Sequence, residues 1–316
     1  MSTTVHSTAD KRTQLDDLAG RVRDGDCVAV GGGLSSREPM ALLRALIRQG
    51  KKGLRVVGSA HGIDIDLLCG GGTVAASGES YVGFEQDFGM APNYRRACES
   101  GAVAVEDSSC ATLVAQLRAA IQGVPFMPIR SVRGTGFERL HPEFKRMTCP
   151  FTGEELLLVP ALAPDVALLH AQFGDARGNV CIDGPPVADL LFARASREVL
   201  VTVERIVSTD ELHTKRGTIV PGFYVSALAE VPFGAHPTAC YPFYAYDRPH
   251  TAAYYAAAQA GPAAFEDRYL RPFVRDCASH DAYLETIGGR ALQKRLASWV
   301  DGSKSWQELY RAEAAP

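Results

Sequence analysis

The chain has 316 residues, of which 46% are hydrophobic and 22% charged, and its formal net charge is -3. This length and apolar content suffice for one or two domains around a large buried core. A nearly neutral chain without a basic stripe gives no indication of binding to nucleic acid or to an anionic membrane.

The eight cysteines are scattered, with no C-x-x-C pair and no paired Cys/His spacing. This pattern argues against a disulfide framework or a structural zinc ion, so we expect buried thiols of a reducing compartment and no metal site. The N-terminal residues 1–17 are polar and lack the apolar core of a signal peptide. No apolar run reaches the roughly 18 residues that span a bilayer. The sequence therefore predicts a soluble, cytoplasmic protein.

Residues 1–12 are expected to be flexible, and residues 15–22 to form a short helix. Residues 24–39 then predict a buried strand at 28–30, a glycine turn and the start of a helix. Ser35 or Ser36 can cap that helix, and Pro39 suits its first turn. Apolar residues at helical spacing between 40 and 47 predict that one face of the helix packs on a sheet.

The glycine turn consists of Gly31, Gly32 and Gly33. Glycines allow close approach of the backbone to a ligand, and free N–H groups at a helix start favour negative charge or a carbonyl oxygen. A tight connection between strand and helix is the alternative reading. A dinucleotide fingerprint is absent, because Ser36 stands at the third glycine position and the next strand ends in Gly58-Ser59 instead of an acid. No G-K-[ST] tripeptide occurs, so a Walker A loop is also excluded.

Strands predicted at 54–57, 73–76 and 103–105 alternate with helices predicted at 63–69, 91–100 and 111–121. Such alternation is typical of an α/β fold with an open, mostly parallel sheet and helices on both faces. Ligands of such sheets bind at the carboxyl ends of the strands. Three of these ends carry polar or glycine-rich loops, at 31–36, 58–62 and 106–110, and we expect them to converge on one crevice.

Residues 125–153 are rich in proline and glycine and predict a long loop. Further strands are predicted at 156–159, 166–171, 180–182, 199–203, 218–220 and 227–231. The alanine- and tyrosine-rich tail from 251 predicts helices. The expected organisation is a flexible segment at 1–12, an α/β domain at 13–250 and a C-terminal helical extension at 251–316.

Glu106 and Asp107 follow a buried strand, where a carboxylate could act as a general base. The alternative is that Asp107 or a following serine caps the next helix. His61 could donate a hydrogen bond to a carbonyl or phosphate, or be a satisfied loop histidine. Arg130 could attract a polyanionic cofactor, or be a solvated surface charge.

The opening stretch resembles the signature of the α (A) subunit of family I coenzyme A transferases. The resemblance rests on Asp24-Gly25, residues 28–30, Gly31-Gly32 and Pro39, while Gly33 and Arg37 stand where the signature has Phe and Gly. Residues 92–97, 123–130, 175–184 and 231–240 are similar to the glutaconate CoA-transferase branch of that family. Together these segments cover about residues 10 to 245.

The resemblance implies an open α/β fold and an A/B heterodimer or heterotetramer. It implies that CoA passes between an acyl-CoA and a carboxylic acid by a ping-pong mechanism, with coenzyme A as substrate and no tightly bound cofactor. The nucleophilic glutamate lies in a Ser-Glu-Asn-Gly motif of the B subunit, and this chain has no such motif. In this role Gly31 to Gly33 would shape the site, with Ser35, Ser59, His61 and Glu106 lining the crevice toward the partner.

Two alternatives stay open. The chain is also similar to a sub-branch of CoA-ester hydrolases that open a steroid-derived ring during sterol breakdown, through residues 11–13, 36–39 and 203–207. In such an enzyme water replaces the nucleophilic glutamate, and Glu106 or Asp107 would act as the base. The second alternative is a non-catalytic regulatory or scaffolding protein on the same fold, against which the intact glycine turn and the polar strand ends count.

Overall fold

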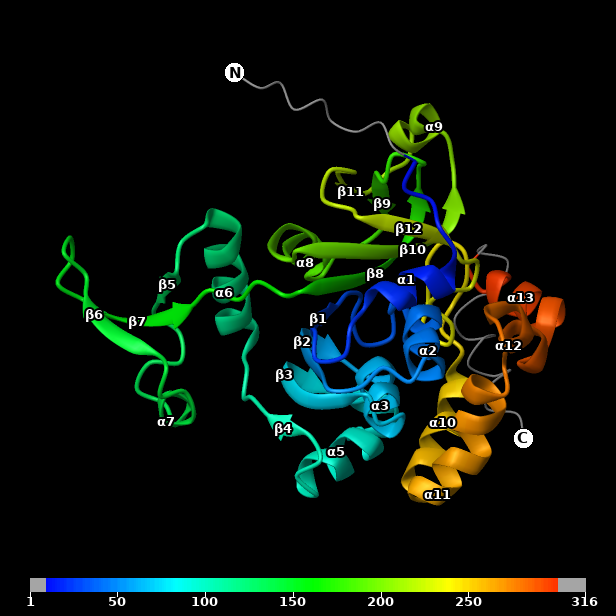
Figure 1. Cartoon of the computed structure of the whole chain (residues 1–316), viewed down its shortest axis with the longest axis horizontal. Coiled ribbons are helices and arrows are strands. Elements are labelled where there is room, and N and C mark those ends of the chain that lie inside the picture. The colour runs from blue at the N-terminus through cyan, green and yellow to red at the C-terminus, as the bar shows by residue number, and fades with distance from the viewer. Residues whose placement is uncertain (1–9, 301–316) are drawn as a thin grey trace.

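The computed structural model describes residues 10–300. In these residues a nine-stranded sheet forms the centre, and a three-stranded sheet projects from it as an arm (Figure 1). The strands of the central sheet are β1 Cys27–Val30, β2 Leu54–His61, β3 Val74–Val82, β4 Ala104–Val105, β8 Val166–Gly174, β9 Val180–Ile182, β10 Glu198–Ile206, β11 Thr218–Val220 and β12 Ala227–Glu230.

Seven strands run parallel in the order β4-β3-β2-β1-β8-β10-β12. Strand β9 pairs antiparallel with the end of β8, and β11 pairs antiparallel with β9. The mostly parallel sheet predicted from alternating strands and helices is therefore confirmed, with the antiparallel pairs confined to one corner.

Helices cover both faces of the sheet, as predicted. Val28 and Val30 of β1 belong to the core shared with α1 Leu15–Arg21, α2 Met40–Arg48 and α3 Ile63–Gly70. Ala29, between them, belongs to the core shared with α6 Cys110–Gln122 and α8 Asp189–Ala195. This division follows from the alternation of side chains along a strand.

Helix α2 is buried on all sides rather than on one face, because the C-terminal helices cover it. All its residues from Met40 to Ile47 are buried, including Arg44. The Arg44 guanidinium donates to the His236 carbonyl at 2.9 Å and lies 3.7 Å from the centre of the Tyr283 ring. The C-terminal extension thus completes the core. Its elements are α10 Arg248–Gln259, α11 Pro262–Phe265, the π-helix η1 Glu266–Arg275, α12 His280–Thr286 and α13 Gly289–Ala297.

The prediction of a loop at 125–153 is wrong, because this segment builds the arm together with the strand correctly predicted at 156–159. Its elements are β5 Phe126–Ile129, α7 Phe137–Leu140, β6 Lys145–Thr148 and β7 Glu155–Pro160, with the antiparallel order β5-β7-β6. Pro128 is tolerated because β5 is an edge strand. A small core of Phe144, Leu157 and Val159 anchors the arm on Ala115 of α6. Figure 1 shows the arm on the opposite side of the molecule from the C-terminal helices.

Strand β2 extends to His61, so the predicted loop at 58–61 is part of the sheet. Its partner β3 pairs with it along this length, for example Gly58 with Glu79 and Ala60 with Tyr81. At the N-terminus, residues 1–9 lie outside the described residues. Lys11 is tied to the sheet edge, since its N–H donates to Ala176 and its carbonyl accepts from Leu228, both at 2.9 Å.

The remaining short helices are α4 Glu85–Phe88, α5 Pro92–Glu99 and α9 Thr209–His213. The Ala91 to Ser100 segment predicted as a helix thus corresponds to α5. None of the helices in residues 10–300 combines the length and the hydropathy needed to cross a membrane.

Candidate functional site

Two of the three glycines of the turn, Gly31 and Gly32, are required by the chain's own packing. A Cβ atom on Gly31 would lie 2.5 Å from the Asp189 carboxylate, and one on Gly32 would lie 2.5 Å from the Arg37 carbonyl oxygen. Gly32 also has a φ of +78°, which other residues rarely adopt. Because these two positions lack side chains, the backbone at the end of β1 packs directly against Asp189 and the Arg37 backbone.

The N–H groups of the turn are already occupied. Gly31 donates to the Leu168 carbonyl at 2.8 Å, Gly32 to Asp189 Oδ1 at 3.1 Å and Gly33 to the Ser36 carbonyl at 3.0 Å. These three N–H groups are therefore not free to bind a ligand. The N-cap of α2 is Pro39 and no side chain caps it, so neither Ser35 nor Ser36 has the predicted capping role.

A buried ion pair fixes the turn. Nη2 of Arg37 lies 3.1 Å from Oδ2 of Asp189 and donates to the Pro185 carbonyl at 2.7 Å, and Nη1 faces the His170 carbonyl at 3.3 Å. Leu34 and Arg37 have φ values of 57° and 55°. Such left-handed conformations persist where surrounding contacts over-determine them.

His61 lies in a buried acidic cluster instead of lining a crevice. Its Nδ1 contacts Asp64 Oδ2, and its Nε2 lies 3.7 Å from Glu79 Oε2. Burial lowers the pKa of His61, but the Asp64 and Glu79 carboxylates outweigh this effect and raise the pKa to about 9. Burial raises the pKa of Glu79 to about 7. Because its ring is 1% exposed, His61 cannot donate directly to a bound substrate.

Glu38 is the most unusual member of this region. Its side chain is fully buried, and no group in residues 10–300 makes a well-aligned hydrogen bond to either carboxylate oxygen. Burial, and then the neighbouring Asp64 carboxylate, hold its pKa well above the ordinary value. Ligand atoms of Glu38, His61 and Asp64 lie within 4.8 Å of one another, so the three have the chemistry of a cation site as well as that of a proton-sharing cluster.

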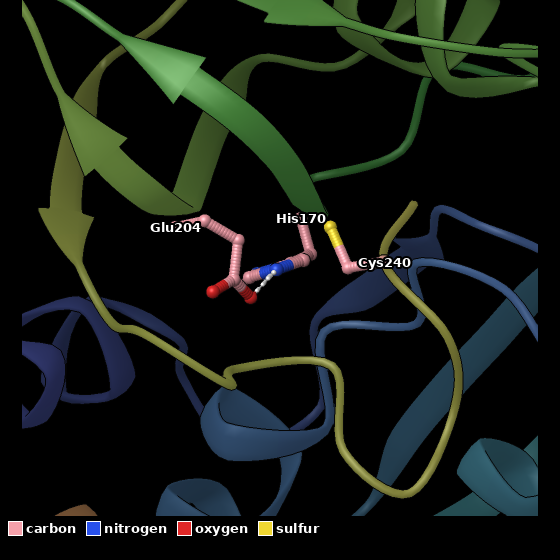
Figure 2. Close-up of side chains that lie close together, drawn as sticks. All are labelled: His170, Glu204 and Cys240. Carbon is pink, nitrogen blue, oxygen red and sulfur yellow. Dashed lines mark hydrogen bonds and ion pairs between the residues drawn. The ribbon is translucent and has the colours of Figure 1, made fainter. Parts of the chain in front are cut away.

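A second group of side chains that could bind a metal ion is instead tied into a hydrogen-bonded network. Figure 2 shows His170, Glu204 and Cys240 side by side. His170 bonds Thr202 Oγ1 through Nδ1 and Glu204 Oε1 through Nε2, both at 2.8 Å. The Tyr244 hydroxyl donates to the same Glu204 oxygen at 2.6 Å. Because both imidazole nitrogens are occupied, this network joins β8 and β10 to the loop that follows β12.

The two predicted acids line a cavity of about 480 Å³ between the main sheet, α6 and the arm. Its polar lining includes Arg55, Glu106, Asp107, Ser108, Gln116, His141 and Glu143. Ser109 caps α6, since its hydroxyl oxygen accepts from the Thr112 N–H at 3.2 Å. The helix cap is therefore a serine, as one alternative foresaw, and Asp107 is left at the cavity wall.

Arg55 holds Glu106 by a two-point contact. Its Nε lies 2.9 Å and 2.8 Å from the two carboxylate oxygens, and its Nη2 lies 2.6 Å from Oε2. The pKa of Arg55 is raised by its hydrogen bond to Glu106. Nη1 donates to Cys27 Sγ at 3.2 Å. Such bidentate pairs fix the orientation of a carboxylate.

The three polar loops do not converge on one crevice. The glycine turn meets β2 near Ala60, whose carbonyl accepts from the Leu34 N–H at 3.1 Å. Glu106 instead meets β2 at Arg55, five residues earlier, which is about 17 Å of extended strand. The reason is that β4 has two residues and pairs with the beginning of β3, so its end lies halfway along the sheet.

The remaining predicted residues lie in three places. Ser59 Oγ is 3.3 Å from Cys110 Sγ, so the 58–62 and 106–110 segments touch at this pair. Ser35 lines a separate cavity of about 270 Å³ beside Tyr246. Arg130 lies on the arm, where it pairs with Glu154 at 2.8 Å and its side chain is 72% exposed.

Sequence reasoning missed Arg55. It stands in the otherwise apolar strand 54–57, and a charged residue there was the available signal. Arg37 and Asp189 were also missed, because their pairing joins segments 152 residues apart. Nothing in the sequence around His141 or Gln116 indicated that these residues line the cavity.

Comparison with known proteins gives matches that cover most of the chain. Residues 12–230 match the family described as coenzyme A transferase. The chain is 32% identical over 299 residues to the A chain of glutaconate CoA-transferase from Acidaminococcus fermentans, covering 89% of this chain and 92% of that protein. The crystal structure of that enzyme is similar with a TM-score of 0.84 and 31% identity, covering 90% of this chain and 95% of the other.

Two further relatives are not described as CoA-transferases. The chain is 35% identical over 240 residues to the cholesterol ring-cleaving hydrolase IpdA subunit of Rhodococcus jostii, covering 73% of this chain and 81% of that protein. It is 35% identical over 292 residues to an uncharacterized protein of Archaeoglobus fulgidus, covering 91% of this chain. The chain spans 64% of the length of the Archaeoglobus protein.

Proposed function

Because this chain belongs to the coenzyme A transferase family, we propose that it is the A subunit of a two-subunit enzyme that moves CoA from an acyl-CoA to a carboxylic acid. The observation that carries the proposal is the agreement with the glutaconate CoA-transferase structure over 90% of this chain at a TM-score of 0.84. The agreement extends beyond the family's matched region at 12–230 into the C-terminal helices.

In the proposed reaction the thioester carbonyl is attacked by a glutamate that the B subunit supplies. CoA leaves as the thiolate and a mixed anhydride forms, and the thiolate then attacks the glutamyl carbonyl to give an enzyme–CoA thioester and the free acid. The second carboxylic acid reverses these steps and departs as its CoA ester. This chain contributes a wall of the site, and the 480 Å³ cavity is the proposed place for the acyl group.

The proposed contact surface for the B subunit is the arm and the cavity rim. Exposed apolar side chains gather there, among them Phe151 at 93%, Leu140 at 59% and Val105 at 52% exposure. Large apolar groups at a surface favour burial in an interface. Leu140 and Val105 also line the cavity, so the same partner would close it.

Co-expression with the B subunit tests the proposal. The complex should transfer CoA from glutaconyl-CoA or succinyl-CoA to acetate, and hydroxylamine should trap a glutamyl thioester on the B subunit. This chain alone should show no exchange. Full exchange activity in the isolated chain, or no covalent intermediate during exchange, would contradict the proposal.

A CoA-ester hydrolase is the second candidate, favoured by the position of Glu106 and Asp107 at the cavity wall. There one of these carboxylates would take a proton from water, and the hydroxide would add to the carbonyl carbon next to the bond to be cleaved. That bond then breaks, and the departing sulfur or carbon takes the proton back from the carboxyl group. A hydrolase predicts ring opening or release of free CoA without a covalent adduct and without an acceptor acid. A non-catalytic scaffold predicts neither reaction.

A further inference from the structure

Within residues 10–300, Arg55 is the one cation that pairs with the Glu106 carboxylate. We infer that Arg55 is the positioning residue for Glu106 and fixes that carboxylate against bound substrate in the 480 Å³ cavity. The inference rests on the proposed function, in which this cavity receives the acyl group of a CoA ester.

The first argument is geometric. Arg55 Nε contacts both oxygens of Glu106 at 2.9 Å and 2.8 Å, and Nη2 contacts Oε2 at 2.6 Å. The planar guanidinium therefore fixes both the place and the plane of the carboxylate. A carboxylate has about four lone-pair positions, so this contact leaves acceptor capacity for a proton of water or substrate.

The second argument is that the fold leaves room for this pair. Glu106 follows β4, whereas Arg55 belongs to β2, so the carboxylate must reach across β3. The residue of β3 at the crossing is Gly78, and even a Cβ atom there would lie at an ordinary contact distance of 3.5 Å from Glu106 Oε2, so nothing on β3 blocks the pair. On the far side, Cys27 Sγ accepts from Arg55 Nη1 at 3.2 Å and holds the guanidinium in place.

The third argument is charge. Among the residues that line the cavity, Arg55 is the single arginine or lysine, whereas Glu106, Asp107 and Glu143 are acids. His141 pairs with Glu143 at 2.8 Å and so belongs to another carboxylate. Removing Arg55 would leave the cavity with uncompensated negative charge, which would repel anionic acyl-CoA substrates.

The fourth argument is that stability does not require this pair. Both side chains are more than a third exposed, at 37% and 38%. Ion pairs that solvent can reach contribute little to the folded state. A two-point pair at the wall of a cavity instead has the features of a preorganised site.

The experiment uses the A/B complex and steady-state CoA release or transfer with glutaconyl-CoA and succinyl-CoA. Arg55→Met should lower kcat by about 100-fold, since a displacement of about 1 Å at a reacting group has such effects. Arg55→Lys, which keeps the charge but loses the fork, should restore part of kcat. Guanidinium ion at sub-denaturing concentration should partly rescue Arg55→Ala. Arg95→Met is the matched control, because Arg95 pairs with Glu99 on the surface of α5.

The outcomes separate the inference from the proposed function. If Glu106→Gln is inactive while Arg55→Met keeps more than half of kcat, the positioning role is wrong and the site stands. If Arg55→Ala loses activity together with melting temperature and guanidinium does not rescue it, Arg55 is structural and the inference is overturned. If Glu106→Gln is fully active, the cavity is not the site and the inference fails with it.

Discussion

Nη2 of Arg37 lies 3.1 Å from Oδ2 of Asp189, and the two side chains are 3% and 0% exposed. This buried pair joins the segment that follows the glycine turn to the first residue of α8. Asp189 also accepts the Gly32 N–H at 3.1 Å, so one carboxylate organises the turn from two sides.

Arg37→Met should lower the free energy of unfolding by about 3–5 kcal/mol, because it leaves the Asp189 carboxylate buried and unpaired. Urea unfolding followed by circular dichroism measures the loss. The double variant Arg37→Met/Asp189→Asn should recover part of it, since the uncompensated charge is then gone. A loss below about 1 kcal/mol in the single variant would show that this pair does not stabilise the turn.

Gly32→Ala should destabilise the protein more than Gly72→Ala. Both glycines have a positive φ, at +78° and +73°, but the new Cβ would lie 2.5 Å from the Arg37 carbonyl oxygen at Gly32 and would meet nothing within 4 Å at Gly72. We expect about 1 kcal/mol for the backbone conformation at Gly72, and roughly 2 kcal/mol more at Gly32 because a backbone atom must move. Equal melting temperatures for the two variants would show that the contact between the new Cβ atom and the Arg37 carbonyl oxygen does not destabilise the protein.

Glu38→Gln should raise the free energy of unfolding at pH 8 by about 1 kcal/mol. The reason is that a neutral amide replaces a buried carboxyl group to which no well-aligned donor is bonded. The raised pKa of Glu38 determines whether its contribution to stability rises or falls with pH. The folded protein keeps a proton that the unfolded chain releases above about pH 4.5, so the original residue becomes less favourable as pH rises.

Glu204→Gln is the matched control for Glu38. Its carboxylate accepts hydrogen bonds from the Phe233 N–H and the Tyr244 hydroxyl, so its loss should destabilise the protein. If both variants changed stability in the same direction, the missing partners of Glu38 would not be the cause.

Acid should destabilise the region of the C-terminal helices through His250. Burial, and then the charge of His236, lower the pKa of His250 from 6.5 to about 3. Between these values the unfolded chain binds a proton that the folded protein does not, so this contribution to stability is present above pH 6.5 and is lost as pH falls toward 3. Unfolding at pH 5 should take up about one proton fewer in His250→Gln, as the pH dependence of the urea midpoint would report. An unchanged pH dependence would show that His250 titrates normally.

Phe151→Asp should weaken association with the B subunit by about tenfold, or about 1.4 kcal/mol, if the arm forms the proposed interface. Isothermal titration calorimetry of the two subunits measures this change. Phe223→Asp is the control, because Phe223 is also exposed, at 69%, but lies outside the arm. Similar affinities for both variants and the unaltered chain would place the partner elsewhere.

Local patterns in the sequence were enough for the fold class. Short apolar runs, separated by segments with helical spacing, predicted the parallel strands and the helices on both faces. They failed at 125–153, where prolines and glycines indicated a loop. The arm strands there are short, and two of them are edge strands, so their pairing depends on contacts with β7 and α6 rather than on local pattern.

The sequence by itself identified Glu106, Asp107, His61 and the glycine turn as candidates for chemistry. Only the tertiary structure decided which of them meet. The register of β4 on β3 placed Glu106 beside Arg55 and away from the turn, and burial removed His61 from any surface. Residue type and local spacing are properties of neighbours in the chain. Strand register and ion pairs across the sheet depend instead on packing between segments that are far apart in sequence.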